Sequence, residues 1–121
     1  MLDHVSLKVA DFTRSAAFYD AALQPLGLRR LMGDGQNYTG YGDDRPFFWI
    51  GRGGDPGSGA HVAFVAKDRK TVDAFYAAAI AAGGRDNGGP GIRAHYHPTY
   101  YGAFVLDPDG HNVEAVCHAP A

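Results

Sequence analysis

The sequence has little of several features that define particular classes of protein. It has one cysteine, Cys117, so no internal disulfide can form, which is typical of a reducing compartment. Eleven lysines and arginines against 13 aspartates and glutamates give a net charge of −2, so the positive field that attracts nucleic acids is absent. No apolar run approaches the roughly 20 residues that span a bilayer, and the residues after Met1 do not resemble a signal peptide. We therefore expect a cytoplasmic protein without a nucleic-acid or membrane partner.

Two residue types are abundant in this chain of 121 residues, whose length fits one domain. Its 17 glycines indicate many turns between short strands. Its six histidines raise the question of metal binding or acid–base chemistry.

The chain contains an internal repeat. An offset of 61 − 4 = 57 residues places His4 on His61, and it also aligns 17–19 with 74–76, each an Ala-Phe-Tyr triplet. Agreement at one offset over several segments indicates two copies of one structural unit. A glycine-rich stretch between them has the composition of a flexible linker.

Each copy begins with a predicted strand followed by a predicted helix. Every second residue is apolar after His4 (Val5, Leu7, Val9) and after His61 (Val62, Phe64, Ala66), which predicts two strands. Both histidines then lie on the face away from the core. Asp11 and Asp68 then occupy helix N-cap positions, and an apolar stripe at helical spacing follows each of them. Further strands are predicted at 28–32, 38–41 and 47–50 in the first copy, and at 100–106, 112–117 and somewhere within 85–96 in the second.

These patterns predict an α+β fold of two βαβββ modules. The helices cover the outer face of each mixed sheet, and the two curved sheets form an open cavity. The single domain divides into module 1 at about 1–51, a linker at about 52–59 and module 2 at about 60–118.

Three side chains are candidates for a metal site. His4 and His61 would point into the cavity from equivalent strands, and Glu114 would join them from the last strand, where it alternates with core residues. Two imidazoles and a carboxylate can hold a divalent ion while leaving coordination positions open for a substrate.

Several motifs resemble the vicinal oxygen chelate superfamily, which includes glyoxalase I, fosfomycin-resistance thiol transferases, extradiol dioxygenases and metal-free bleomycin-binding proteins. They are His4-Val5-x-Leu7-x-Val9-x-Asp11, Phe18-Tyr19, His61-Val62-Ala63-Phe64 and Asp107-Pro108-Asp109-Gly110-x-x-x-Glu114. The resemblance implies one divalent ion, of Mn, Fe, Zn, Ni or Co, that chelates two neighbouring substrate oxygens. It places the ligands at His4, His61 and Glu114. It also implies a homodimer, in which His4 of one subunit can join His61 and Glu114 of the other.

Two departures from the family patterns disfavour particular activities of the family. The position of the fourth glyoxalase I ligand holds Trp49, whose indole cannot ligate a metal, so glutathione glyoxalase I activity is disfavoured. The fosfomycin transferases have a tyrosine where this chain has Phe104, which disfavours that activity as well.

A polar and aromatic cluster at 93–101 is the predicted source of substrate contacts. Tyr100, Tyr101 and His97 are candidate proton donors or acceptors, and Arg93 and His95 are candidate substrate contacts. If a strand begins at Tyr100, the two neighbouring tyrosines face opposite sides, so at most one enters the cavity.

Two residues of the first module complete the predicted substrate site. Ser6 can offer a hydroxyl near the metal, and Trp49 can form an aromatic wall. By contrast, we expect no role in the site for His111 or His118.

The sequence therefore predicts a small metal-dependent enzyme of the lyase, thiol transferase or dioxygenase type. In it, the metal is a Lewis acid toward a small molecule that chelates through two adjacent oxygens. The alternative is a metal-free binding or sequestering protein of the bleomycin-resistance type.

Overall fold

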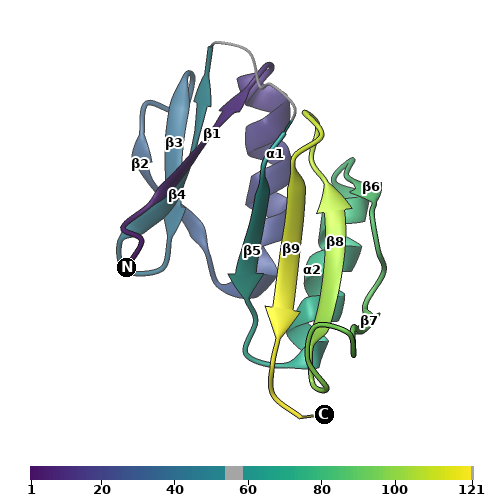
Figure 1. Ribbon diagram of the computed structural model, residues 1–121. Helices are drawn as coiled ribbons and strands as arrows, with labels where there is room; N and C mark the ends of the chain where they lie inside the picture. The colour runs from purple at the N-terminus through teal and green to yellow at the C-terminus, as the bar shows by residue number, and fades with distance from the viewer. Residues whose placement is uncertain (54–58, 121) are drawn as a thin grey trace.

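The computed structural model describes residues 1–53 and 59–120 and contains two βαβββ modules (Figure 1). The first consists of β1 (Val5–Val9), α1 (Phe12–Leu23), the short 3-10 helix η1 (Gln24–Leu26), β2 (Arg29–Gly33), β3 (Tyr38–Gly42) and β4 (Pro46–Arg52). Its sheet has the order β1-β4-β3-β2, in which β1 and β4 are parallel and the other pairs antiparallel.

The second module repeats this plan with an extra short strand. It consists of β5 (His61–Val65), α2 (Arg69–Ala81), β6 (Arg85–Asp86), β7 (Gly91–Ile92), β8 (Tyr101–Leu106) and β9 (Asn112–Cys117). The strand order is β5-β9-β8-β6, with β7 also paired to β8. As in the first module, the first strand is parallel to the last, here β5 to β9.

Both helices begin at the predicted caps. The Asp11 carboxylate accepts a hydrogen bond from the Arg14 amide at 3.1 Å, and the Asp68 carboxylate accepts one from the Thr71 amide at 2.8 Å. These amides would otherwise lack a partner at the first turn, so each aspartate fixes where its helix starts.

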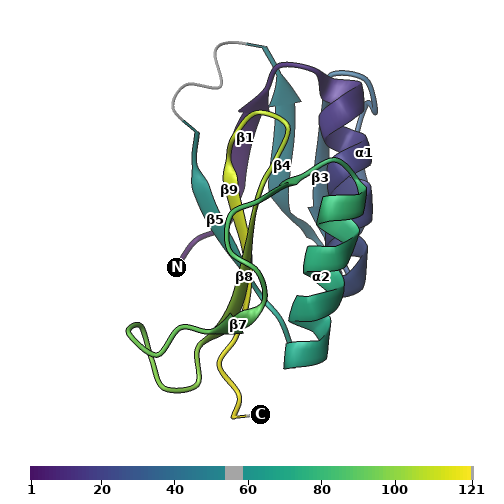
Figure 2. The same cartoon turned by 90° about the vertical axis from the view of Figure 1, so that its right-hand side faces the viewer.

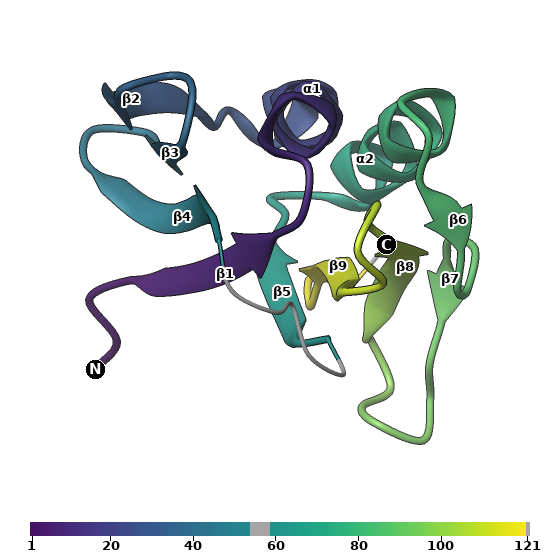
Figure 3. The same ribbon diagram turned by 90° about the horizontal axis from the view of Figure 1, so that it is seen from above.

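The helices lie side by side on one side of the two sheets (Figures 2 and 3). Their apolar stripes pack on the buried face of the strands, and a single core joins side chains of both modules, such as Tyr19 and Phe48 of the first and Phe64 and Phe75 of the second. On the opposite face of the strands, Ser6, Lys8 and Ala63 are exposed. The predicted α+β class with two βαβββ modules is confirmed, and the sheet of each module is open in the described residues.

Strand boundaries differ from expectation in the second module. The weakly marked strand expected within 85–96 is two short strands, because a glycine- and proline-containing segment separates them. In addition, Tyr100 precedes β8 instead of beginning it. Most of the predicted linker, residues 54–58, lies outside the described part of the chain.

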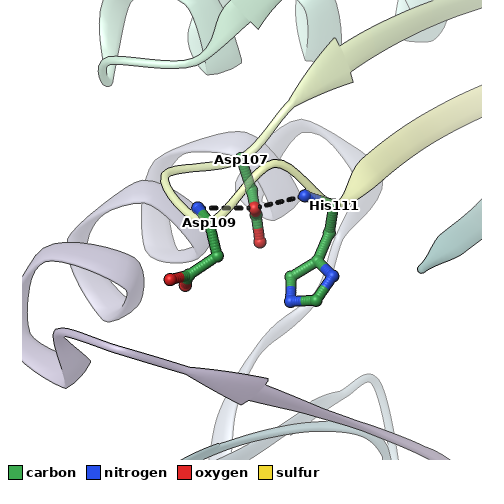
Figure 4. Close-up of side chains that lie close together, drawn as sticks. All are labelled: Asp107, Asp109 and His111. Carbon is green, nitrogen blue, oxygen red and sulfur yellow. Dashed lines mark hydrogen bonds between the residues drawn. The ribbon is translucent and has the colours of Figure 1, made fainter. Parts of the chain in front are cut away.

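A buried polar cluster joins the turn between β8 and β9 to the first module (Figure 4). The Asp107 carboxylate accepts bonds from the amides of Asp109 and His111 at 2.9 and 2.8 Å and from the Tyr19 hydroxyl at 2.6 Å. His111 donates from Nε2 to the Lys8 carbonyl at 3.0 Å. We call Asp107, Asp109 and His111 the turn cluster.

The turn cluster also holds the start of α1 and of β5. Asp109 accepts from the Ala10 amide at 3.1 Å and from the Ser15 hydroxyl at 3.3 Å. Nδ1 of His111 accepts from the Ala60 amide at 2.9 Å. Contacts far apart in the sequence therefore fix one module against the other.

Neither of the described helices is long and apolar enough to cross a membrane.

We predict that Tyr19→Phe lowers the free energy of unfolding by about 1–3 kcal/mol, because one oxygen of the buried Asp107 loses its donor. Burial, followed by the nearby Asp107 charge, raises the pKa of Tyr19 well above its usual value, so the hydroxyl remains a donor at neutral pH. Urea unfolding measures the loss. The matched control is Tyr76→Phe at the repeat-equivalent position, where the bond to Asp86 is exposed and its loss has a small effect. Equal stability of the two variants would contradict this role of Tyr19.

Candidate functional site

Glu114 is the central residue of the candidate site. It is the only glutamate in the chain and lies on β9, paired in register with Ala63 of β5 and Phe104 of β8. Its side chain is 1% exposed. A buried carboxylate needs hydrogen-bond partners, and those found for Glu114 identify the site.

Two side chains lie at hydrogen-bond distance from the oxygens of this carboxylate. Nε2 of His61 lies 2.9 Å from Oε1, at hydrogen-bond distance, and the Tyr100 hydroxyl donates to Oε2. Within the described residues, no lysine or arginine forms an ion pair with Glu114. Burial, followed by the hydrogen bond to Glu114, raises the pKa of Tyr100 to about 12, so the phenol is a donor and not a base at neutral pH.

The contact between His61 and Glu114 fits a metal ion. Ligand atoms about 2.1 Å from an ion and at right angles to each other are separated by about 3 Å, close to the observed Nε2–Oε1 distance. The His61 side chain is 54% exposed, so an ion could reach it from solvent. A buried carboxylate beside an accessible imidazole is a suitable donor set for a divalent ion.

His4 lies apart from this pair. It precedes β1, and its Nδ1 is 2.8 Å from a carboxylate oxygen of Asp3, whose other oxygen is 3.4 Å from Arg45. The bond to His4 and the Arg45 charge lower the pKa of Asp3. Both His4 and His61 line a cavity of about 440 Å³, but among the described residues the ligand atoms of His4, His61 and Glu114 do not all lie within 4.8 Å of one another.

The remaining first-module candidates lie near His4 on the exposed sheet face. Ser6 and Trp49 are paired in register and line a cavity of about 250 Å³ together with His4. The indole of Trp49 lies across β3 at Gly40, where a Cβ atom would come within 2.8 Å of the ring, so glycine is required for this packing. The pairing of Ser6 with Trp49 corresponds to that of Ala63 with Glu114, so Trp49 does occupy the position equivalent to Glu114.

Tyr100 and Tyr101 point to opposite faces of the sheet, as expected. Tyr100 contacts Glu114, whereas the Tyr101 hydroxyl donates to Asp73 of α2 at 2.6 Å on the helix side. The structure therefore brings only Tyr100 to the candidate site.

The other candidate residues of the 93–101 segment are Arg93, His95 and His97, which precede Tyr100 in the chain. Arg93 donates to the carbonyls of Gly89 and Gly91, both at 2.7 Å, and lines a cavity of about 310 Å³ with His95. His97 is exposed, and its Nδ1 accepts from the Thr99 amide at 3.1 Å. The substrate roles of Arg93 and His95 and the proton-transfer role of His97 stay predictions.

The turn cluster is a second group with metal-ligand chemistry, since one potential ligand atom from each of its residues lies within 4.8 Å of the others. From the sequence, we expect no role in the candidate site for His111. Each side chain of the turn cluster already has protein hydrogen-bond partners between the two modules. This bonding accounts for the cluster as a structural connection.

Comparison with known proteins supports the family suggested by the sequence motifs. Residues 1–115 match the model of the Glyoxalase/Bleomycin resistance protein/Dioxygenase superfamily. No curated protein matches the sequence.

Solved structures provide relatives over nearly the whole chain. A glyoxalase/bleomycin resistance protein from Albidiferax ferrireducens T118 is 31% identical, with a TM-score of 0.82 over 97% of this chain and 98% of that one. A putative glyoxalase from Bacillus halodurans is 23% identical, with a TM-score of 0.73 over 97% and 95% of the two chains.

A mutant of the fosfomycin resistance protein FosX from Listeria monocytogenes, solved with Mn(II) and 1S,2S-dihydroxypropylphosphonic acid, shares the fold. It is 19% identical, with a TM-score of 0.72 over 96% of this chain and 88% of that one. The family match and the 31% identical relative together show that this chain belongs to the glyoxalase/bleomycin resistance protein/dioxygenase superfamily.

Proposed function

We propose that the protein is a small metal-dependent enzyme of this superfamily. The observation that carries the proposal is the contact of the exposed His61 with the buried Glu114 on the sheet face opposite α1 and α2. The Mn(II)-bound FosX structure supports it as an example of metal binding on the same fold.

His4, His61 and Glu114 would hold one divalent ion, of Mn, Fe, Zn, Ni or Co. The ion would supply Lewis-acid chemistry to a substrate that chelates through two adjacent oxygens. Ser6 would donate a hydrogen bond to the substrate, and Trp49 would provide an apolar wall. The cavity shared by His4 and His61 is lined mainly by apolar side chains, such as Phe47 and Phe64, which would limit the access of water to a bound small molecule.

A second candidate function is metal-free binding of a small molecule, as in proteins of the bleomycin-resistance type. It is favoured by the hydrogen bonds of Glu114, because both carboxylate oxygens have partners within the protein. The same apolar cavity would then bind a ligand without chemistry.

Metal analysis distinguishes the two candidates. We predict that protein purified without a metal-binding tag carries one divalent ion per site, and that chelator treatment lowers its Tm. An ion that binds only the folded state stabilises it by about 2.7 kcal/mol at about 100 times its Kd. Elemental analysis and thermal unfolding with added ions measure both effects. Protein with no bound ion and with an unchanged Tm after each ion is added would favour metal-free binding.

We predict that Glu114→Gln abolishes metal retention and leaves the fold intact, because the amide keeps the shape of the side chain but is a poor ligand. Isothermal titration with Mn²⁺ measures binding, and circular dichroism checks the fold. Asp44→Asn is the control, since it removes an equal charge from the exposed turn between β3 and β4. Unchanged binding by the Glu114 variant would remove this residue from the ligands.

We further infer that two copies of the chain assemble into a homodimer that completes the site. The support is the separation of His4 from the pair formed by His61 and Glu114, together with the exposed sheet faces of both modules. In such a dimer the partner subunit's His4 would join His61 and Glu114.

Mixing two defective variants tests this arrangement. His4→Ala and Glu114→Gln are each expected to lose metal binding. If the ligands come from different subunits, mixed dimers contain one intact site, so random reassociation restores about a quarter of all sites. Unfolding and refolding the variants together, followed by Mn²⁺ titration and mass measurement by light scattering, gives the result. No recovery by a mixture that is dimeric would place all three ligands in one chain.

A further inference from the structure

Tyr100 reaches Glu114 by passing over the glycine at position 102. It lies just before β8, and its ring crosses Gly102 to bring the hydroxyl to Oε2 of the carboxylate. A Cβ atom at Gly102 would lie 3.2 Å from the Tyr100 ring and 3.3 Å from Oε2. A glycine at this position therefore leaves room for both groups.

The Tyr100 ring is held on several sides. Its centroid lies 5.0 Å from that of Tyr96 and 5.2 Å from that of His118, which meets it edge to face. The Tyr100 backbone donates to the His97 carbonyl at 3.0 Å and accepts from the Arg93 amide at 2.7 Å. These contacts fix the ring before any ligand binds.

The two oxygens of Glu114 consequently have different surroundings. Oε1 faces the imidazole of His61, which is accessible to solvent, whereas Oε2 is occupied by the Tyr100 hydroxyl. A carboxylate can bind a cation through one oxygen or through both. The hydroxyl competes with the second mode, since a hydrogen-bonded Oε2 is turned toward the protein.

We infer that Tyr100 is a positioning residue that makes Glu114 a ligand through Oε1 alone. This inference rests on the proposed function, because it concerns the same metal site. Its consequence is an additional open coordination position: three positions instead of two remain on a six-coordinate ion, so a water can stay bound beside a substrate that chelates through two oxygens. Tyr100 thus acts through Glu114.

The test compares the hydration of Mn²⁺ bound to the metal-stripped full chain and to two variants. Tyr100→Phe removes the hydroxyl and keeps the ring, and Tyr101→Phe is the matched control, because its hydroxyl binds Asp73 on the helix side. Water-proton relaxation at saturating Mn²⁺ reports the number of exchangeable water ligands. With three protein ligands on a six-coordinate ion, we expect about three waters in the wild type and about one fewer in Tyr100→Phe. Tyr101→Phe should match the wild type.

The outcomes separate this inference from the proposed function. Mn²⁺ binding with equal hydration in the wild type and Tyr100→Phe overturns the role of Tyr100 and leaves the metal site in place. Failure of the wild type to bind Mn²⁺ overturns both. If Tyr100→Phe does not fold, the wild-type count decides, since about two waters would mean that Glu114 binds through both oxygens.

Discussion

The carboxylate of Glu114 is almost completely buried, although it lies on the sheet face away from the helices. The surrounding residues are placed so that both of its oxygens have hydrogen-bond partners. The carboxylate has two such partners, His61 from the parallel neighbour β5 and Tyr100 from the segment before β8. Gly102 of β8 leaves the space that Tyr100 needs to reach it. An unpaired carboxylate at this position would be strongly destabilising. The register of β5, β9 and β8 is therefore coupled to the chemistry of the site.

The two modules have the same topology and different roles. The position of Glu114 in the second module is occupied by Trp49 in the first, with corresponding strand pairing. One sheet face therefore presents a carboxylate and an imidazole, and the other presents an indole beside His4 and Ser6. The proposed site made from both faces would therefore be chemically asymmetric, with a carboxylate and an imidazole on one side and an aromatic surface on the other.

Much of the fold could be predicted from the sequence because its signals are local. The strand alternation, the caps at Asp11 and Asp68 and the 57-residue repeat each follow from neighbouring residues or from simple comparison of the chain with itself. The weak strand within 85–96 could not be placed, because glycine and proline remove the periodicity on which such a prediction depends. For the site, alternation along β9 was enough to put Glu114 on the same face as His61.

The partners of individual side chains could not be predicted. That Tyr100 contacts Glu114 while Arg93 binds loop carbonyls depends on the path of an irregular segment. The roles of His111 and Asp107 depend on contacts with Lys8 and Tyr19, about 90 to 100 residues away in the chain. Long-range hydrogen bonds of this kind have no periodic pattern in the sequence.

The hydrogen bond of Tyr19 to Asp107 has a consequence for the independence of the two modules. The equivalent tyrosine of the second module, Tyr76, bonds to Asp86 within its own module, whereas Tyr19 bonds across to the other one. The first module therefore depends on the second, because separating them would remove the acceptor of the Tyr19 hydroxyl and expose to water the core that both modules share. The two copies of the repeat are therefore complementary parts of one core and are not equivalent to each other.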